Sequence, residues 1–471
     1  MGCEGDYTMP CTTILVGKKA SYDGSTLMAR NDDSQAGELN IKKCVVIKPE
    51  EQMKQYASVL SAFKMDLPED PMRYTCVPNV KKDRGIWAGA GINEVNVAMS
   101  ATETITSNPR VLGADPLCND GIGEEDMVVL VLPYIHSARE GVLRLASILE
   151  KYGTYEMNGI GFQDVDEIWW LETIVGHHWI AKRVPDDRYV IMANQQGIDS
   201  FDFSDAFGNK ENHMCHPDML NFIKDNFLNS TGSSFENFNV REAFGSKSDF
   251  DKVYNTPRVW YSQRYLNPNS YIDEPESFTL PWSLTPESLI SIEDVKYVLS
   301  SHYQHTDVDP YNNGSNKYRS VGINRNTFVV CTQLRPYCQK DRMAVEWLAF
   351  ACNAFNTFIP FYANVTSLPS YIQDTPEIVD SNSLFWASRM IGALTDSHYA
   401  SCHPYVEQYQ LKVQSQMHTF LSQFDKDSMH DLKDKNQIIS DYMQKETTLL
   451  LNELLFIDCN EMKNAFSRSD G

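Results

Sequence analysis

Short apolar runs rich in β-branched residues alternate with turn residues over the first two hundred positions, which is typical of strands. The run 11–16 is followed by an Asp23-Gly24 turn and by a second run at 26–30, so we predict a hairpin. Alternating polar and apolar residues at 95–102 predict another strand with one buried face. Further strands are predicted at 44–47, 74–78, 167–174, 178–183, 188–193 and 328–331.

Helical periodicity marks a middle segment and the C-terminal part of the chain. Two helices are predicted at 124–132 and 138–152, separated by Pro133. Residues 200–320 are rich in Asn, Ser, Asp and Pro, and we expect long connections with inserted helices there. Segment 344–365 mixes both signals, whereas 382–424 and 433–466 are helical in pattern. This order of elements predicts an α+β protein with additional helices toward the C-terminus.

Length and charge narrow the class of protein. A chain of 471 residues could form two or three domains, but it contains neither repeats nor a clear linker, so we expect one. The net charge of −22 disfavours nucleic acid and anionic membranes as partners, because both would repel it. The longest apolar run, 127–132, is far shorter than the roughly 20 residues of a membrane-spanning helix.

The cysteines and the N-terminus indicate a cellular compartment. Eleven cysteines, an odd number, follow no disulfide spacing, which predicts reduced thiols. Residues 1–10 have neither a basic segment nor an apolar one, so they do not form a secretory signal. We therefore expect a cytoplasmic protein whose first ten residues are either a removable leader or a tail.

Cys11 is the strongest candidate for a catalytic residue. It opens the first predicted strand, and the return strand leads into Arg30 and Asp33. A thiolate needs a base or a positive neighbour, and Arg30 supplies the positive charge. Cleavage between Pro10 and Cys11 would give that residue a free α-amine, whose pKa of about 7.7–8.0 suits a general base. Asp33 would then hold the amine in place.

The segment that begins at Cys11 resembles a known family. Its sequence, Cys-Thr-Thr-Ile-Leu-Val-Gly-Lys-Lys-Ala-Ser-Tyr-Asp-Gly-Ser-Thr, is similar to the C69 dipeptidases among the N-terminal nucleophile hydrolases. Bile-salt hydrolases and penicillin V acylases are more distant relatives of that family. The similarity extends to about residue 260 through the segments 100–104, 167–172, 193–195 and 254–260.

The resemblance implies a fold and a reaction. It implies a four-layer αββα sandwich in which residues 1–10 are a propeptide and 11–471 form a single domain. It also implies that autocatalytic cleavage exposes Cys11 and that the enzyme hydrolyses dipeptides with broad specificity, without a metal or cofactor. In this alignment Arg30 and Asp33 match an Arg-Asn-x-Asp pattern, Asn194 matches an oxyanion donor, and Arg258 matches an arginine near the nucleophile.

Glu103 departs from the pattern of the related acylases, which use asparagine at this position. A carboxylate there can pair with the free ammonium group of a dipeptide, which an acyl substrate lacks. Glu103 is therefore a candidate substrate-binding residue. We expect Glu103→Gln to raise KM for dipeptides, and an unchanged KM would count against this role.

Several alternatives remain open from the sequence. Asp32 competes with Asp33 as the site acid and points to the other face of the strand. The chain could instead be an acylase of other amides, or a secernin-like regulatory protein if residues 1–10 stay attached. The last helix carries Leu449, Leu450 and Leu454, which either pack on the sandwich or form a homo-oligomer contact.

Overall fold

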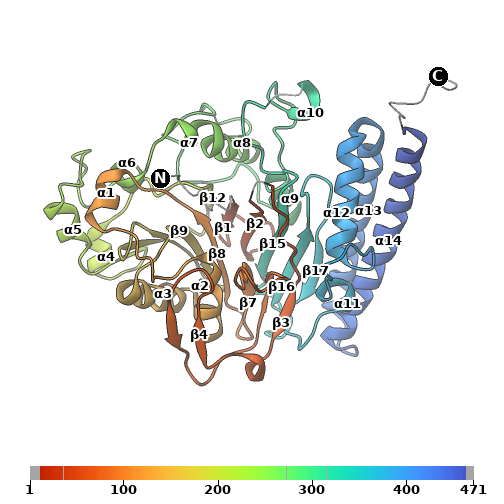
Figure 1. The fold of residues 1–471 in the computed structure, drawn as a ribbon, viewed down its shortest axis with the longest axis horizontal. Coiled ribbons are helices and arrows are strands. Elements are labelled where there is room, and N and C mark those ends of the chain that lie inside the picture. Colours follow the sequence, from red (N-terminus) through yellow and green to blue (C-terminus); the bar gives the residue numbers. More distant parts are fainter. Residues whose placement is uncertain (1–10, 36, 272, 314–315, 463–471) are drawn as a thin grey trace.

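A central antiparallel sheet of seven strands holds the N-terminal segment of the protein (Figure 1). The computed structural model describes residues 11–35, 37–271, 273–313 and 316–462. In spatial order the strands are β14 (Ser283–Leu284), β12 (Tyr189–Met192), β1 (Thr12–Val16), β2 (Thr26–Asp33), β15 (Asn326–Leu334), β16 (Ala344–Phe350) and β17 (Ile359–Tyr362).

The predicted N-terminal hairpin is confirmed, and its second strand is longer than expected. β1 pairs with β2 in a register that places Thr13 opposite Arg30 and Thr12 opposite Asn31. β2 continues to Asp33, because β15 pairs with its other edge along almost the whole strand. The segment that carries Arg30 is therefore held on both sides in the middle of the sheet.

A second antiparallel sheet, of six strands, packs against the first. Its order is β13 (His213–Cys215), β11 (Trp179–Arg183), β10 (Ile168–Thr173), β9 (Asn158–Gln163), β8 (Ala98–Thr104) and β7 (Ala90–Ile92). Leu15 and Met28 point from the first sheet toward Gly161 of β9, where a Cβ atom would lie 2.5 Å from the Met28 sulfur. Gln163 also donates a 2.7 Å hydrogen bond across the gap to the carbonyl oxygen of Thr26.

Two small sheets of two strands each and several helices surround these large sheets. One small sheet pairs β3 (Val45–Ile47) with β6 (Tyr74–Cys76), and the other pairs β4 (Gln55–Ala57) with β5 (Lys64–Asp66). The shorter helices are α1 (Pro109–Ala114), α4 (Phe203–Phe207), α5 (Met219–Asp225), α6 (Val240–Phe244), α7 (Asp249–Tyr254), α10 (Pro310–Asn313) and α11 (Ser370–Gln373). Single turns of 3₁₀ helix lie at Pro49–Glu51 and Leu132–Tyr134.

Helices α2 (Glu124–Val131) and α3 (Ala138–Tyr152) cover the outer face of the six-stranded sheet. The Ser137 hydroxyl caps α3 by accepting from the backbone N–H of Glu140. The apolar face of α3 buries Val142, Leu145 and Leu149 in the same core as large side chains of the sheet. Both predicted helices are thus confirmed.

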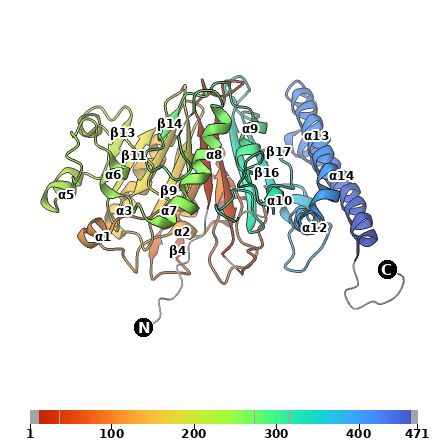
Figure 2. The ribbon, with the colours of Figure 1, turned by 90° about the horizontal axis from the view of Figure 1, so that it is seen from above.

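The outer face of the seven-stranded sheet is covered by α8 (Thr256–Leu266), α9 (Ile292–Val298), α12 (Leu384–Ser397), α13 (Tyr399–Phe424) and α14 (Leu432–Asn460). Figure 2 shows α13 and α14 as the outermost pair on this side. The pattern at 382–424 predicted one helical stretch, but His398 separates α12 from α13. Leu450 and Leu454 are buried, whereas Leu449 is 52% exposed.

Helix α14, rather than another strand, lies beside the outer edge of strand β17. The side-chain oxygen of Asn436 in α14 accepts a 2.9 Å hydrogen bond from the backbone N–H of Tyr362. Its Nδ2 donates at 3.1 Å to the carbonyl oxygen of the same residue. One buried amide thus satisfies both backbone groups of Tyr362 on the edge side of the sheet.

The α+β class is confirmed, and one strand begins later than its sequence pattern indicates. The strand predicted at 95–102 is β8, which begins at Ala98. Asn96 adopts a positive φ of 64° in the preceding turn, and Val95 is 43% exposed. The alternating pattern therefore ran through a turn. Within the described ranges, no helix has both the length and the apolar character needed to cross a membrane.

Candidate active site

Cys11 is fully buried at the head of β1. Its backbone nitrogen donates to the side-chain oxygen of Asn194 at 3.3 Å. Asn194 follows β12, the neighbour of β1 in the sheet, so strand pairing brings residues 183 positions apart into contact. This placement puts the nitrogen that a cleavage before Cys11 would free next to a polar acceptor.

Arg30 lies beside the sulfur of Cys11. Its Nη2 atom is 3.2 Å from the Cys11 Sγ, and it also donates to Asp32 Oδ1 at 2.6 Å and to Glu124 Oε1 at 2.5 Å. Burial lowers the pKa of Arg30, but the negative charges of Cys11, Glu124 and Asp32 outweigh that effect and raise it. The guanidinium is therefore a permanent positive charge at the thiol.

Three acidic side chains around Arg30 lie as close together as the ligands of a metal ion would. Ligand atoms of Cys11, Asp32 and Glu124 lie within 4.8 Å of one another. The Arg30 guanidinium donates to all three, so a cation already occupies the centre of this group. Lys42 adds a second buried positive charge, 3.8 Å from Asp32. Burial lowers the pKa of Lys42, and the charge of Asp32 opposes this shift.

Asp33 lies on the opposite face of β2 from Arg30 and Asp32, as alternation along a strand requires. Its carboxylate accepts hydrogen bonds from Asn31, Asn326 and Arg319. Asn31 in turn accepts a 2.6 Å hydrogen bond from the backbone N–H of Thr12. Asp33 is therefore linked to the residue after Cys11 through Asn31, whereas Asp32 is the acid in contact with Arg30.

Arg258 joins the nucleophile segment to the loop that holds Asn194. It lies in the first turn of α8, where its Nη1 atom donates to the carbonyl oxygen of Cys11 and to the Thr12 hydroxyl. Its Nη2 atom donates to the side-chain oxygens of Asn194, at 2.8 Å, and Asn255, at 2.6 Å. One buried guanidinium thus fixes Cys11 and Asn194 relative to each other.

Asn194 retains one unused donor. Its side-chain oxygen accepts from Cys11 and Arg258, and its carbonyl oxygen accepts from Asn255 at 3.1 Å. Its Nδ2 group is buried and has no hydrogen-bond partner among the residues that the structure describes. Unpaired buried donors are rare in folded proteins, so this N–H group is free to bind an oxygen atom that enters the site.

Two candidates cannot be placed in this arrangement. Pro10 lies outside the described residues, and so does the bond that it makes to Cys11. Glu103 belongs to β8, but its side chain is outside the described part of the chain. Their suggested roles therefore stay predictions.

The structure adds residues that the sequence reading did not select. Glu124 contacts Arg30 from 94 positions away, and Arg319 contacts Asp33 from 286 positions away. Asn255 contacts Asn194 from 61 positions away. A local signal existed for one of them, since Glu124 opens a triplet of acids directly after Gly123. Acids favour the first turn of a helix, but full burial of all three exceeds what capping requires.

Comparison with known sequences identifies relatives over nearly the whole chain. The family model of Peptidase family C69 matches residues 10–412. "Probable dipeptidase A" of Streptococcus pyogenes serotype M3 is 52% identical, over 98% of this chain and 100% of the relative. "Dipeptidase" of Bifidobacterium longum is 45% identical, again over 98% of this chain and 100% of the relative. "Dipeptidase A" of Lactobacillus helveticus is 43% identical, over 94% and 96%.

Proposed function

The chain belongs to peptidase family C69, and from this membership we propose that it is a dipeptidase of broad specificity with Cys11 as its nucleophile. The names of the relatives supply the substrate class, because they are dipeptidases that align over almost their full length. The observation that carries the proposal is the position of the Cys11 sulfur, 3.2 Å from the buried guanidinium of Arg30.

Residues 1–10 are, in this proposal, a propeptide, and cleavage between Pro10 and Cys11 produces the active form. Residues 11–471 then form a single domain of the N-terminal nucleophile hydrolase type, with the two sheets between helical layers as an αββα sandwich. Two observations support this form. Cys11 stands directly before β1, and its nitrogen already has a polar acceptor in Asn194.

Acyl transfer begins when the Cys11 thiol loses its proton, and the positive charge of Arg30 stabilises the resulting thiolate. The sulfur attacks the peptide carbonyl, and the negative charge of the tetrahedral intermediate develops on the carbonyl oxygen. The Nδ2 group of Asn194 is the donor available to that oxygen. Because the side-chain oxygen of Asn194 is fixed by Arg258, the donor is held in place before the substrate arrives.

The freed α-amine of Cys11 completes the reaction. It takes the thiol proton, gives a proton to the leaving amino acid and then activates the water that hydrolyses the thioester. Asn194 orients this amine directly, and Asp33 supports the same segment through Asn31 and Thr12. Glu103 pairs with the ammonium group of the dipeptide in this scheme. No step requires a metal or a cofactor.

The test is the intact mass of freshly purified wild type and Cys11→Ala, together with dipeptide hydrolysis. We expect wild type to lack residues 1–10 and to be active, and Cys11→Ala to keep them and be inactive. Cys118→Ala is the matched control, since Cys118 is a partly exposed free thiol on another element. Retention of the leader by wild type, with no peptidase activity, would favour a secernin-like role. Cleavage of non-peptide amides alone would favour an acylase.

A further inference from the structure

A basic pocket lies next to the site, although the chain as a whole carries a net charge of −22. Its volume is about 630 Å³, and its walls include the loop 316–325, the end of α7 and part of α10. Lys317, Arg319 and Arg325 contribute positive charges. Among the described residues that line the pocket, Asp396 is the only carboxylate, and it accepts a hydrogen bond from the Tyr311 hydroxyl. The pocket is therefore suited to an anion.

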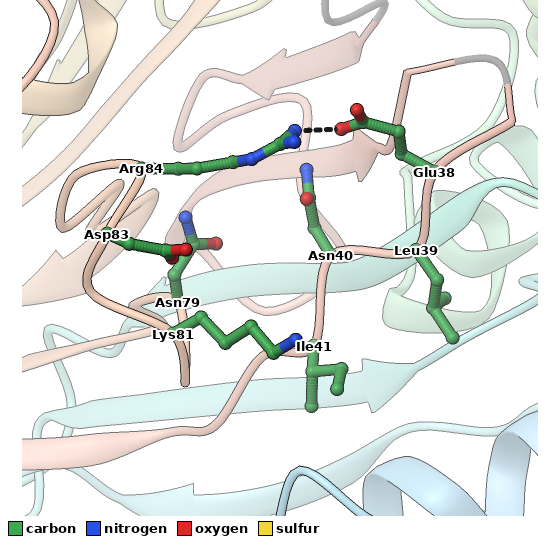
Figure 3. Close-up of a pocket in the computed structure, with 8 residues that line it drawn as sticks. All are labelled: Glu38, Leu39, Asn40, Ile41, Asn79, Lys81, Asp83 and Arg84. Atoms are coloured by element: carbon green, nitrogen blue, oxygen red, sulfur yellow. Dashed lines mark hydrogen bonds and ion pairs between the residues drawn. The ribbon is translucent and has the colours of Figure 1, made fainter.

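A second pocket provides a contrast (Figure 3). Its lining includes Lys81 and Arg84, but also Glu38 and Asp83, and Arg84 forms an ion pair with Glu38. The positive and negative charges of that pocket therefore balance. The excess of positive charge is a property of the pocket around Arg319, not a general feature of the surface.

Arg319 has donors that no described residue uses. Its side chain is only 8% exposed, and its Nη2 atom forms an ion pair with Asp33. The Nε and Nη1 atoms are buried and have no hydrogen-bond partner within the described ranges. Leaving a charged donor buried and unsatisfied is costly, so these atoms are arranged for an acceptor that binds from outside the chain.

Arg319 is coupled to the nucleophile by contacts on two sides. Through Asp33 and Asn31 it is linked to the backbone of the residue after Cys11. The Arg319 guanidinium also lies 5.4 Å from the centre of the Tyr254 ring, and the carbonyl oxygen of Tyr254 accepts a 2.8 Å hydrogen bond from Arg258, which donates to Cys11.

The groups that shift the pKa of Arg319 include Cys11, in agreement with these contacts. Burial lowers the pKa of Arg319, the positive charge of Arg325 lowers it further, and the negative charge of Cys11 opposes both. Arg325 forms no ion pair with any described carboxylate. Arg319 and Arg325 thus carry two positive charges against the one carboxylate of Asp33, and an incoming anion would balance this excess.

We propose that Arg319 binds the α-carboxylate of the leaving residue of the dipeptide, so that it determines specificity for substrates with a free C-terminus at that position. This inference rests on the proposed dipeptidase function. A guanidinium matches a carboxylate in shape and charge, and two of its nitrogens are available. Arg319 takes no part in bond making or bond breaking.

The proposal explains how a site could be restricted to dipeptides. The α-carboxylate lies one residue beyond the scissile carbonyl in a dipeptide. In a tripeptide cut at the same bond it lies one residue further, which displaces it by about 3.5 Å. The carboxylate would then no longer reach a buried guanidinium that Asp33 holds in place.

The experiment compares kcat/KM for a dipeptide and for its C-terminal amide, using the full-length protein as purified. For wild type we expect the free dipeptide to be preferred by about 10- to 100-fold, the worth of a charge-assisted hydrogen bond. For Arg319→Gln the ratio should fall to near one, mainly through KM for the free dipeptide. Arg319→Lys, which keeps the charge, should give an intermediate ratio and serves if the glutamine variant does not fold.

Lys64→Gln is the control, because it removes a positive charge from an exposed position of β5 that does not line this pocket. It should keep the wild-type ratio. A wild type that is active on dipeptides but equally active on their amides would overturn the inference while leaving the proposed function intact. If kcat/KM fell equally for both substrates in Arg319→Gln and Arg319→Lys, the inference would be wrong, and Arg319 would only hold Asp33 in position. A wild type inactive on every dipeptide would instead refute the proposed function.

Discussion

The Nη2 atom of Arg30 lies 3.2 Å from the sulfur of Cys11, and the same atom donates to the carboxylate of Glu124. The thiol and the carboxylate therefore compete for one positive charge. Burial raises the pKa of Glu124, while the charge of Arg30 opposes that shift. The balance between these two groups sets how readily Cys11 loses its proton.

Glu124→Gln should lower the pKa of the Cys11 thiol. The substitution removes a carboxylate whose oxygen lies within 4.8 Å of the sulfur, and a nearby like charge disfavours the thiolate and so raises the pKa of the thiol. The measurement is the pH dependence of iodoacetamide alkylation, followed by mass spectrometry of the peptide that contains Cys11. Asp120→Asn, at an exposed acid just before α2, is the control and should leave the profile unchanged. An unshifted or raised profile in Glu124→Gln would contradict this balance.

Asn194→Ala should reduce kcat for dipeptide hydrolysis by about 10²–10³, because it removes the donor available to the oxyanion. KM should change much less, since the negative charge develops only in the transition state. Steady-state kinetics of the purified variant provide the measurement. Gln195→Ala, at the adjacent half-buried position, is the comparison and should stay close to wild type. A loss confined to KM would argue that Asn194 only positions the substrate.

Arg258→Met should lower the free energy of unfolding by about 3 kcal/mol or more. Its guanidinium donates to oxygens of Cys11, Asn194 and Asn255, and each buried acceptor left unpaired costs about 1–3 kcal/mol. Urea denaturation followed by circular dichroism gives this quantity. Arg264→Met, at an exposed position of the same helix, should fall within about 0.5 kcal/mol of wild type. Similar stability of the two variants would mean that other groups hold the Cys11 segment.

Glu346→Gln should stabilise the protein at alkaline pH. Glu346 is fully buried in β16, accepts a hydrogen bond from the Thr75 hydroxyl, and has its pKa raised by burial to about 7. A folded-state pKa above the unfolded value means that its contribution is complete below about pH 4.5 and is lost as pH rises through about 7. The neutral amide avoids that loss, which amounts to about 3 kcal/mol.

Thermal unfolding of Glu346→Gln and wild type at pH 5 and pH 8.5 measures this effect. The difference in Tm should be small at pH 5 and should favour the variant at pH 8.5. Glu453→Gln, at an exposed position of α14, should show no such dependence. A variant that is less stable than wild type at pH 8.5 would show that Glu346 is charged and stabilised in the fold.

The hairpin of β1 and β2 was predictable because its signals are local. An apolar run, an Asp-Gly turn and a second run fix the strands, and alternation separates Asp32 from Asp33. Alternation places Arg30 and Asp32 on one face, but it does not say which face the thiol occupies, so the contact between Arg30 and the Cys11 sulfur required the structure. The same rule failed at Val95, where a turn imitates the period of a strand.

Such local patterns could not predict the site residues that come from distant parts of the chain. Asn255 and Arg319 belong to loop-rich parts of the chain in which neither period is present. Asn255 reaches the site because it directly precedes α8, which packs on the seven-stranded sheet, and Arg319 reaches it because the loop before β15 lies over Asp33. A contact of this kind depends on how whole layers stack, and no short window of sequence encodes it.

Asn436 covers part of the outer edge of the seven-stranded sheet. The exposed edge of a sheet is a template onto which strands of other molecules can add. By occupying both backbone groups of Tyr362, Asn436 removes that template at the end of β17. The long C-terminal helices therefore act as a guard against self-templated aggregation, and loss of this one amide would weaken that protection even in a protein that still folds.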